Sequence, residues 1–161
     1  MDQPRTEAVE AFWKRFREAS GLHHDEYAVI AFGDSPAMMD ELAGLVLGGV
    51  KRATTCLERS FTEDGEMPPV VGGHVVVVDG RGRPVCIFRT TGLRTGALDS
   101  VDDGFAWDEG EGERTRAWWL AAHRSYFGRE ARHKGFAFDD GIATVFERFT
   151  VVWPPEVADP A

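Results

Sequence analysis

A lysine and a threonine lie three residues apart at a sharp corner of this chain, and together they could act as a nucleophilic pair. Lys51 follows the glycines Gly48 and Gly49 and precedes Thr54 and Thr55. A hydroxyl attacks well only when a base takes its proton, and a partly buried lysine can be that base if its pKa falls. The alternative reading makes Lys51 a solvated loop cation and the threonines ordinary strand residues.

A second set of candidate residues is acidic. Residues 108–113 contain four carboxylates interrupted by two glycines. Glycine lets the backbone approach another element closely, so we expect Glu109 and Glu111 to be brought against a neighbouring element. Further on, Trp119 and His123 share one stripe of a predicted helix. That stripe is either core packing, with His123 a structural histidine, or a wall on which a nucleobase stacks.

A helix and a strand position the corner. Ser35 and Pro36 form a helix start, with a capping side chain before a residue that fits the first turn without its N–H. The apolar spacing over residues 34–47 predicts an amphipathic helix, which Gly48 and Gly49 end. Small and β-branched residues then predict a strand over 53–57.

The remaining chain alternates between helical and strand patterns. Further helices are predicted over residues 6–19, 100–107 and 113–127, and further strands over 27–32, 74–78, 84–91 and 144–153. The long polar segment 58–73 predicts a loop, of a length often used for functional lids.

One strand carries a polar residue on its apolar face. Glu147 interrupts the alternation of the 144–153 strand. Because a buried carboxylate needs a partner, Lys51 and Arg89 are the candidates for it.

Composition restricts the class of protein. The chain has 161 residues, of which 43% are hydrophobic and 28% charged, as in one soluble domain. No apolar run could cross a bilayer and no signal peptide is evident, so we expect no membrane partner and a cytoplasmic location. We expect Cys56 and Cys86 to be reduced thiols in the core. The scattered histidines predict no metal site, and we expect no other cofactor.

The net charge of −9 argues against nonspecific binding of nucleic acid, because such binding needs a basic surface. Any contact with RNA must therefore be local. We expect a short single strand or a modified nucleoside as the ligand.

Several separated motifs together resemble the ASCH domain. They are the corner 49–55, the hairpin 78–86, the acidic run 105–114, the stripe Trp119, His123 and Phe127, and the strand segment 146–149. The resemblance implies an α+β, PUA-like mixed β-barrel with helices packed around its mouth. It divides the chain into an N-terminal helical extension (1–31), the ASCH domain (32–153) and a loose tail (154–161).

The resemblance also implies a cleft for RNA or a nucleoside. Some similar proteins are amidohydrolases that remove the acetyl group of N4-acetylcytidine, and others are described as ribonucleases. Carried over by motif, the catalytic roles fall on Lys51, Thr54 and Glu109. The substrate-binding candidates are Arg52, Thr55, Arg89, Glu111, Trp119 and His123. The chain departs from the family pattern at Arg52, Glu113 and Leu120, none of which is a predicted catalytic residue.

These readings make different demands on Lys51. As an amidohydrolase, the site must lower the pKa of Lys51 by burial or through Arg52, while Thr54 attacks and Glu109 protonates the leaving amine. As a ribonuclease, Lys51 must stay charged. A non-catalytic domain would bind RNA or a nucleoside through Lys51, Arg52 and Arg89, or would regulate a larger assembly. Monomer and homodimer are both open.

Overall fold

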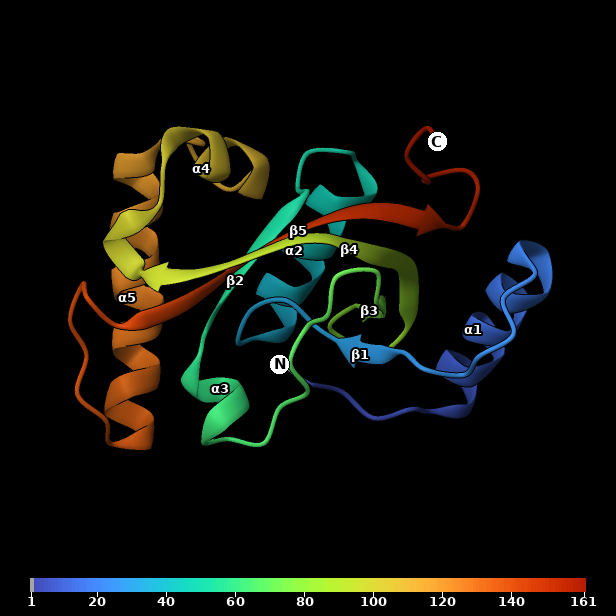
Figure 1. The fold of residues 1–161 in the computed structure, drawn as a ribbon, viewed down its shortest axis with the longest axis horizontal. Coiled ribbons are helices and arrows are strands. Elements are labelled where there is room, and N and C mark those ends of the chain that lie inside the picture. Colours follow the sequence, from blue (N-terminus) through green and yellow to red (C-terminus); the bar gives the residue numbers. More distant parts are fainter. Residues whose placement is uncertain (1) are drawn as a thin grey trace.

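Five strands form one mixed half-barrel sheet in the computed structural model, which describes residues 2–161 (Figure 1). The strands are β1 (Ala28–Ile30), β2 (Ala53–Leu57), β3 (His74–Val78), β4 (Pro84–Ala97) and β5 (Ala143–Trp153). Their order across the sheet is β1-β3-β4-β5-β2. Only the β1–β3 pairing among these strands is parallel. The α+β half-barrel agrees with the fold class expected from the sequence.

Five α-helices surround this sheet. They are α1 (Glu7–Ser20), α2 (Pro36–Leu47), α3 (Arg59–Thr62), α4 (Asp103–Glu109) and α5 (Arg116–Lys134), with a short 3-10 turn at Leu98–Ser100. Helices α1 and α5 lie at opposite ends of the long axis, and α4 lies beside α5 (Figure 1). Within residues 2–161, no helix combines the length and the apolar character needed to cross a bilayer.

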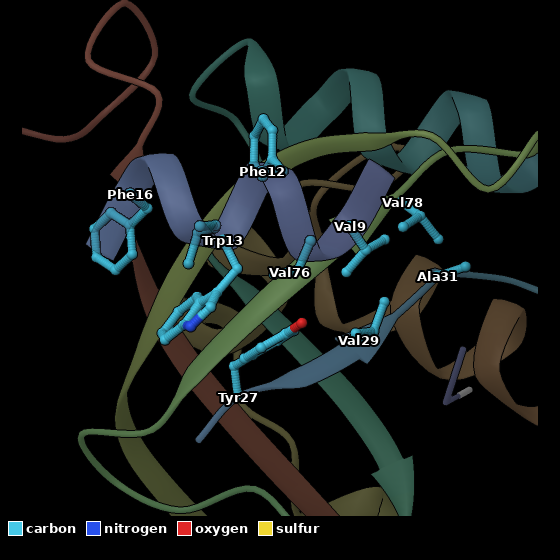
Figure 2. Close-up of a cluster of buried hydrophobic side chains, with 10 residues drawn as sticks. Val9, Phe12, Trp13, Phe16, Tyr27, Val29, Ala31, Val76 and Val78 are labelled. Atoms are coloured by element: carbon cyan, nitrogen blue, oxygen red, sulfur yellow. The ribbon is translucent and has the colours of Figure 1, made fainter. Parts of the chain in front are cut away.

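Helix α1 covers one end of the sheet through an aromatic cluster (Figure 2). Thr6 caps the helix by accepting a hydrogen bond from Val9. Trp13 of α1 stacks on Tyr27 with the ring centroids 4.5 Å apart. Strand β1 follows within the predicted N-terminal extension and pairs with β3, so this extension contributes a strand to the sheet as well as a helix.

The corner forms as its sequence predicts. Ser35 accepts a hydrogen bond from Met38 at the start of α2, and Pro36 occupies the first turn. The helix ends at Gly48, and Gly49 adopts a φ of 80°, a conformation that suits glycine. The chain then turns directly into β2, which pairs with β5.

Helix α5 is longer than the sequence pattern predicts. It begins after Thr115, which accepts a hydrogen bond from Trp118, and it continues past Phe127 to Lys134. Gly135, in the left-handed conformation, caps its C-terminal end. Strand β4 likewise extends beyond the predicted 84–91, because it keeps pairing with β5 as far as Ala97.

The C-terminal segment 154–161, predicted as a loose tail, is attached to the domain. The Asp159 carboxylate accepts hydrogen bonds from Arg52, from the Thr150 hydroxyl and from the Val151 amide, at 2.8 to 3.0 Å. Arg52 was expected to bind substrate. It instead anchors this segment.

Replacing Asp159 with alanine should lower the free energy of unfolding by about 1–3 kcal/mol at pH 7, because four donor groups of three residues lose their acceptor. Burial raises the pKa of Asp159, but the bonds from Arg52 and Val151 outweigh it, and the net pKa is lowered. The stability that the Asp159 carboxylate contributes is therefore fully present above the ordinary aspartate pKa of about 3.9. It is lost as the pH falls through the lower pKa of Asp159 in the folded protein. Urea unfolding between pH 7 and pH 2 measures this.

Asp25→Ala is the matched control, because the Asp25 side chain is 68% exposed. We expect it to change the free energy of unfolding by less than about 0.5 kcal/mol. An equal effect of the two substitutions at pH 7 would contradict the anchoring role of Asp159.

Candidate functional site

Lys51 is buried and bound by two carboxylates from the acidic segment. Its side chain is 1% exposed, and its Nζ lies 3.2 Å from Oε1 of Glu109 and 2.9 Å from Oε2 of Glu111. The same Nζ lies 3.5 Å from the backbone oxygen of Glu109. The lysine of the corner and the glycine-flanked acids therefore meet, although they lie almost sixty residues apart.

Glu109 is the centre of this cluster. Besides Lys51, its Oε1 lies 3.4 Å from Nε2 of His123, and its Oε2 accepts a hydrogen bond of 2.8 Å from the Thr55 hydroxyl. The Trp119 indole N–H donates to the same Oε2. Both oxygens are thus satisfied by side chains from β2 and α5, as a buried charge requires. We refer to Lys51, Glu109, Glu111 and His123 as the ion cluster.

The local backbone explains how α4 reaches the corner. Gly110 ends α4 with a φ of 76°, and a Cβ placed there would lie 2.7 Å from the backbone oxygen of Val50. The Arg52 amide also donates to the backbone oxygen of Asp108 at 2.7 Å. The close approach expected of the glycines in this segment is confirmed at Gly110.

The pKa of Lys51 is raised, contrary to what a lysine base requires. Burial lowers the pKa of Lys51, but attraction to Glu109 and Glu111 outweighs burial. For Glu109, burial raises the pKa, and the charges of Lys51 and His123 then bring it well below its usual range. Lys51 is therefore an ammonium and Glu109 a carboxylate at neutral pH.

The pKa of His123 is raised for a similar reason. Its Nδ1 lies 2.8 Å from the Trp119 carbonyl oxygen, which can only accept, so Nδ1 holds a proton. Burial lowers the pKa of His123, but Glu109 raises it above its ordinary value. Burial raises the pKa of Glu111, and the positive charge of Lys51 lowers it. Repulsion from Glu109 raises it again, so the net pKa of Glu111 is above its ordinary value.

The ion cluster lies at a cavity of about 470 Å³. Thr54, Thr55 and Glu147 contribute to its wall from the sheet, and Trp118, Tyr126 and Phe127 from α5. Met67 and the two prolines after it contribute from residues 58–73, which the sequence predicted as a loop but which include the short helix α3. This segment borders the cavity. The volume falls in the range that binds small molecules.

Acidic residues predominate among the charged residues of the cavity wall. The described carboxylates that line it belong to Asp2, Glu41, Glu66, Glu109, Glu111, Glu130 and Glu147. The described lysines and arginines that line it are Lys51, Arg129 and Lys134. All three are ion-paired, Arg129 with Asp34 and Lys134 with Asp64 and Glu130. Such a wall repels a polyanion and favours a neutral or cationic ligand.

Six of the nine residues predicted for the site line this cavity. They are Lys51, Thr54, Thr55, Glu109, Glu111 and His123. The Thr55 hydroxyl donates a hydrogen bond to Glu109 of the ion cluster. The Thr54 side chain makes no hydrogen bond to the described residues, although it lines the same cavity.

The other three predicted residues do not line the cavity. Arg52 is bound to Asp159, and Arg89 is exposed on β4 opposite His74 of β3. Trp119 is 1% exposed and stacks on His123 with the ring centroids 3.8 Å apart. Its position fits the core-packing alternative, because a covered ring offers no face to a ligand.

Sequence patterns missed two features of the site. The first is Trp118, which lines the cavity beside the predicted Trp119. The second is the partner of Glu147, which is the Thr90 hydroxyl at 2.6 Å rather than Lys51 or Arg89. Only the pairing between β4 and β5 brings Thr90 to Glu147, and no local pattern encodes that pairing.

Three residues of the ion cluster could also ligate a metal. Ligand atoms of Glu109, Glu111 and His123 lie within 4.8 Å of one another. The Lys51 ammonium already contacts both carboxylates, so it supplies the positive charge that a bound cation would bring.

The fold and the site define a small α+β domain with a cavity of about 470 Å³ that a buried ion cluster borders. The family model described as the ASCH domain matches residues 28–153. The chain therefore belongs to the ASCH domain family.

Two solved structures support this assignment. The ASCH domain from Lactobacillus crispatus is 32% identical, with a TM-score of 0.81 over 92% of this chain and 96% of that one. A protein from Enterococcus faecalis is 30% identical, with a TM-score of 0.83 over 90% of this chain and 88% of that one. A search among curated proteins finds no match.

Replacing Glu109 with glutamine should destabilise the fold by about 3–5 kcal/mol, because the buried Lys51 ammonium and the His123 ring would lose the carboxylate charge that they share. The pKa of His123 should also fall, since Glu109 is the main group that raises it. Urea unfolding and NMR titration of the His123 ring measure the two effects.

Glu18→Gln on α1 is the control, because the Glu18 side chain is 65% exposed. Glu111→Gln is a second test if the first variant unfolds, and it should lower the pKa of His123 by a smaller amount. An unchanged His123 titration in both site variants would contradict this account of the ion cluster.

Proposed function

We propose that this ASCH domain is an amidohydrolase that acts on a neutral modified nucleoside of the N4-acetylcytidine class. The observation that carries the proposal is the buried Lys51 ammonium at one wall of the cavity, held by Glu109 and Glu111, with the Thr54 hydroxyl on the same cavity. The resemblance to amidohydrolases of this family supplies the substrate class.

Size and charge favour a nucleoside over a long RNA. A cavity of about 470 Å³ suits a drug-sized ligand. Phosphate groups would meet the acidic wall, and the chain as a whole carries a net charge of −9. A nucleoside without phosphates avoids both penalties.

The charges of the site alter the roles inferred from the family. Because Lys51 is protonated, it serves as a positive charge that stabilises the oxyanion formed when Thr54 attacks the acetyl carbonyl. Glu109 is a poor proton donor, because its pKa lies well below the usual range, and it holds Lys51 in place instead. Proton transfer to and from Thr54 then needs another group.

The ribonuclease alternative also requires a charged Lys51, and the raised pKa of this residue is consistent with it. The carboxylates around the cavity count against it, because they would repel the phosphodiester. A non-catalytic nucleoside-binding domain is the second alternative, since the cavity would serve it equally well.

The wild-type protein should release cytidine and acetate from N4-acetylcytidine. Lys51→Ala and Thr54→Val should each reduce kcat/KM by at least about 100-fold, because each removes a group that acts on the transition state. Chromatography of the nucleoside products measures this. Lys14→Ala is the control, because the Lys14 side chain is 70% exposed on α1.

Each outcome of this assay separates the candidates. The absence of cytidine from wild-type reactions would contradict the amidohydrolase. Calorimetric titration with N4-acetylcytidine that saturates without product would then support the binding domain. Cleavage of a labelled short RNA that is lost in Lys51→Ala would support the ribonuclease.

A further inference from the structure

Glu147 is a buried carboxyl group with no role in the function proposed above. Its exposed fraction is 8%, and it lines the cavity. Its Oε2 accepts a hydrogen bond of 2.6 Å from Thr90, while its Oε1 accepts none from the other described residues. Among residues 2–161, no lysine, arginine or histidine forms an ion pair with it. A carboxyl group in this state has one oxygen available to the cavity.

The sheet places Glu147 directly opposite Thr54. In the antiparallel pairing of β2 with β5, Thr54 and Glu147 are register partners. Opposed residues of such a pair project to the same face, with their Cβ atoms about 4.5–5.5 Å apart. Both residues line the same cavity. The carboxyl group is therefore the cross-strand neighbour of the proposed nucleophile.

The geometry points to Glu147 as the general base that activates Thr54. This inference rests on the proposed function only in taking Thr54 as the nucleophile. No hydrogen bond joins the two side chains in the free protein, and catalytic hydrogen bonds often tighten only when substrate is bound. Thr90 fixes one oxygen of the carboxyl group and leaves the other for the hydroxyl proton.

The other charged groups nearby are less suited to this role. Lys51 is protonated, and Glu109 is bound at both oxygens. Glu111 is paired with Lys51 at 2.9 Å, and the strand pairing sets Glu147, not Glu111, opposite Thr54. Burial raises the pKa of Glu147, with only the Thr90 bond acting against it, and a less acidic carboxyl is a stronger base.

The reaction balances with Glu147 as a proton carrier. The Thr54 Oγ forms a bond to the acyl carbon while its proton passes to Oε1 of Glu147, and the carbonyl oxygen becomes the oxyanion beside Lys51. The oxyanion collapses, the C–N bond breaks, and the Glu147 proton goes to the leaving amine. Water then attacks the Thr54 ester, Glu147 takes a proton from that water, and it returns the proton to the Thr54 oxygen as the acid is released.

A generic ester tests this step without requiring recognition of a nucleoside. The protein is incubated with p-nitrophenyl acetate, and the rate of acetylation at Thr54 is followed by peptide mass spectrometry. We expect Glu147→Gln to slow acetylation of Thr54 by about 100-fold or more. The glutamine amide can still accept from Thr90, so the buried pair is retained, and circular dichroism checks the fold.

Two controls and a rescue separate chemistry from structure. Thr55 is an internal control in the same peptide, because its hydroxyl donates to Glu109. Glu113→Gln, at an exposed position, should acetylate Thr54 at the wild-type rate. In Glu147→Ala, added formate should restore part of the lost rate, which a merely structural role for the carboxyl would not produce.

The possible results are distinct. Slower acetylation in Glu147→Gln with rescue by formate supports the inference, whether or not N4-acetylcytidine is cleaved. Equal rates in wild type and Glu147→Gln overturn it while leaving Thr54 as the nucleophile. No acetylation of wild-type Thr54 also overturns it, and release of cytidine by that same protein would show that the amidohydrolase uses another nucleophile.

Discussion

The buried ion pair between Lys51 and Glu109 constrains the rest of this structure. An unpaired charge in the interior would cost several kcal/mol, so each charged group must meet its partner. Glu109 meets this requirement with four donors, from Lys51, Thr55, Trp119 and His123. These donors come from the corner, β2 and α5, while Glu109 itself ends α4. A shift of any one element would leave a buried charge without its partner, so the pair holds these elements together.

The ion cluster also determines what the cavity can bind and do. Its carboxylates keep Lys51 protonated, which makes the lysine a source of positive charge rather than a base. The surrounding acids make the cavity unfavourable for phosphates, although Lys51 by itself would attract them. Thr54 and Thr55 are adjacent on β2, yet they have different partners. Thr55 donates to Glu109, whereas Thr54 opposes Glu147 in the sheet.

Local patterns predicted most elements, because caps and periodicity act within a few residues. The start of α2 at Ser35 and the start of α4 at Asp102 follow from capping side chains. The ends of longer elements were less predictable. Helix α5 passes the expected end near Phe127 and runs on to its cap at Gly135. Strand β4 continues to Ala97 because it keeps pairing with the distant strand β5. The segment 154–161 is fixed by Asp159, whose partners include an arginine more than a hundred residues away.

The sequence by itself determined most elements, the family resemblance and six of the residues that line the cavity, since these depend on residue types and short spacings. The tertiary structure alone decided that Lys51 is charged, that Glu147 bonds to Thr90, and that Arg52 anchors the C-terminal segment. The physical reason is that a pKa or an ion pair depends on burial and on charges brought together in space. Strand register and helix packing supply those neighbours, and neither is encoded within the short segment that carries the reactive side chain.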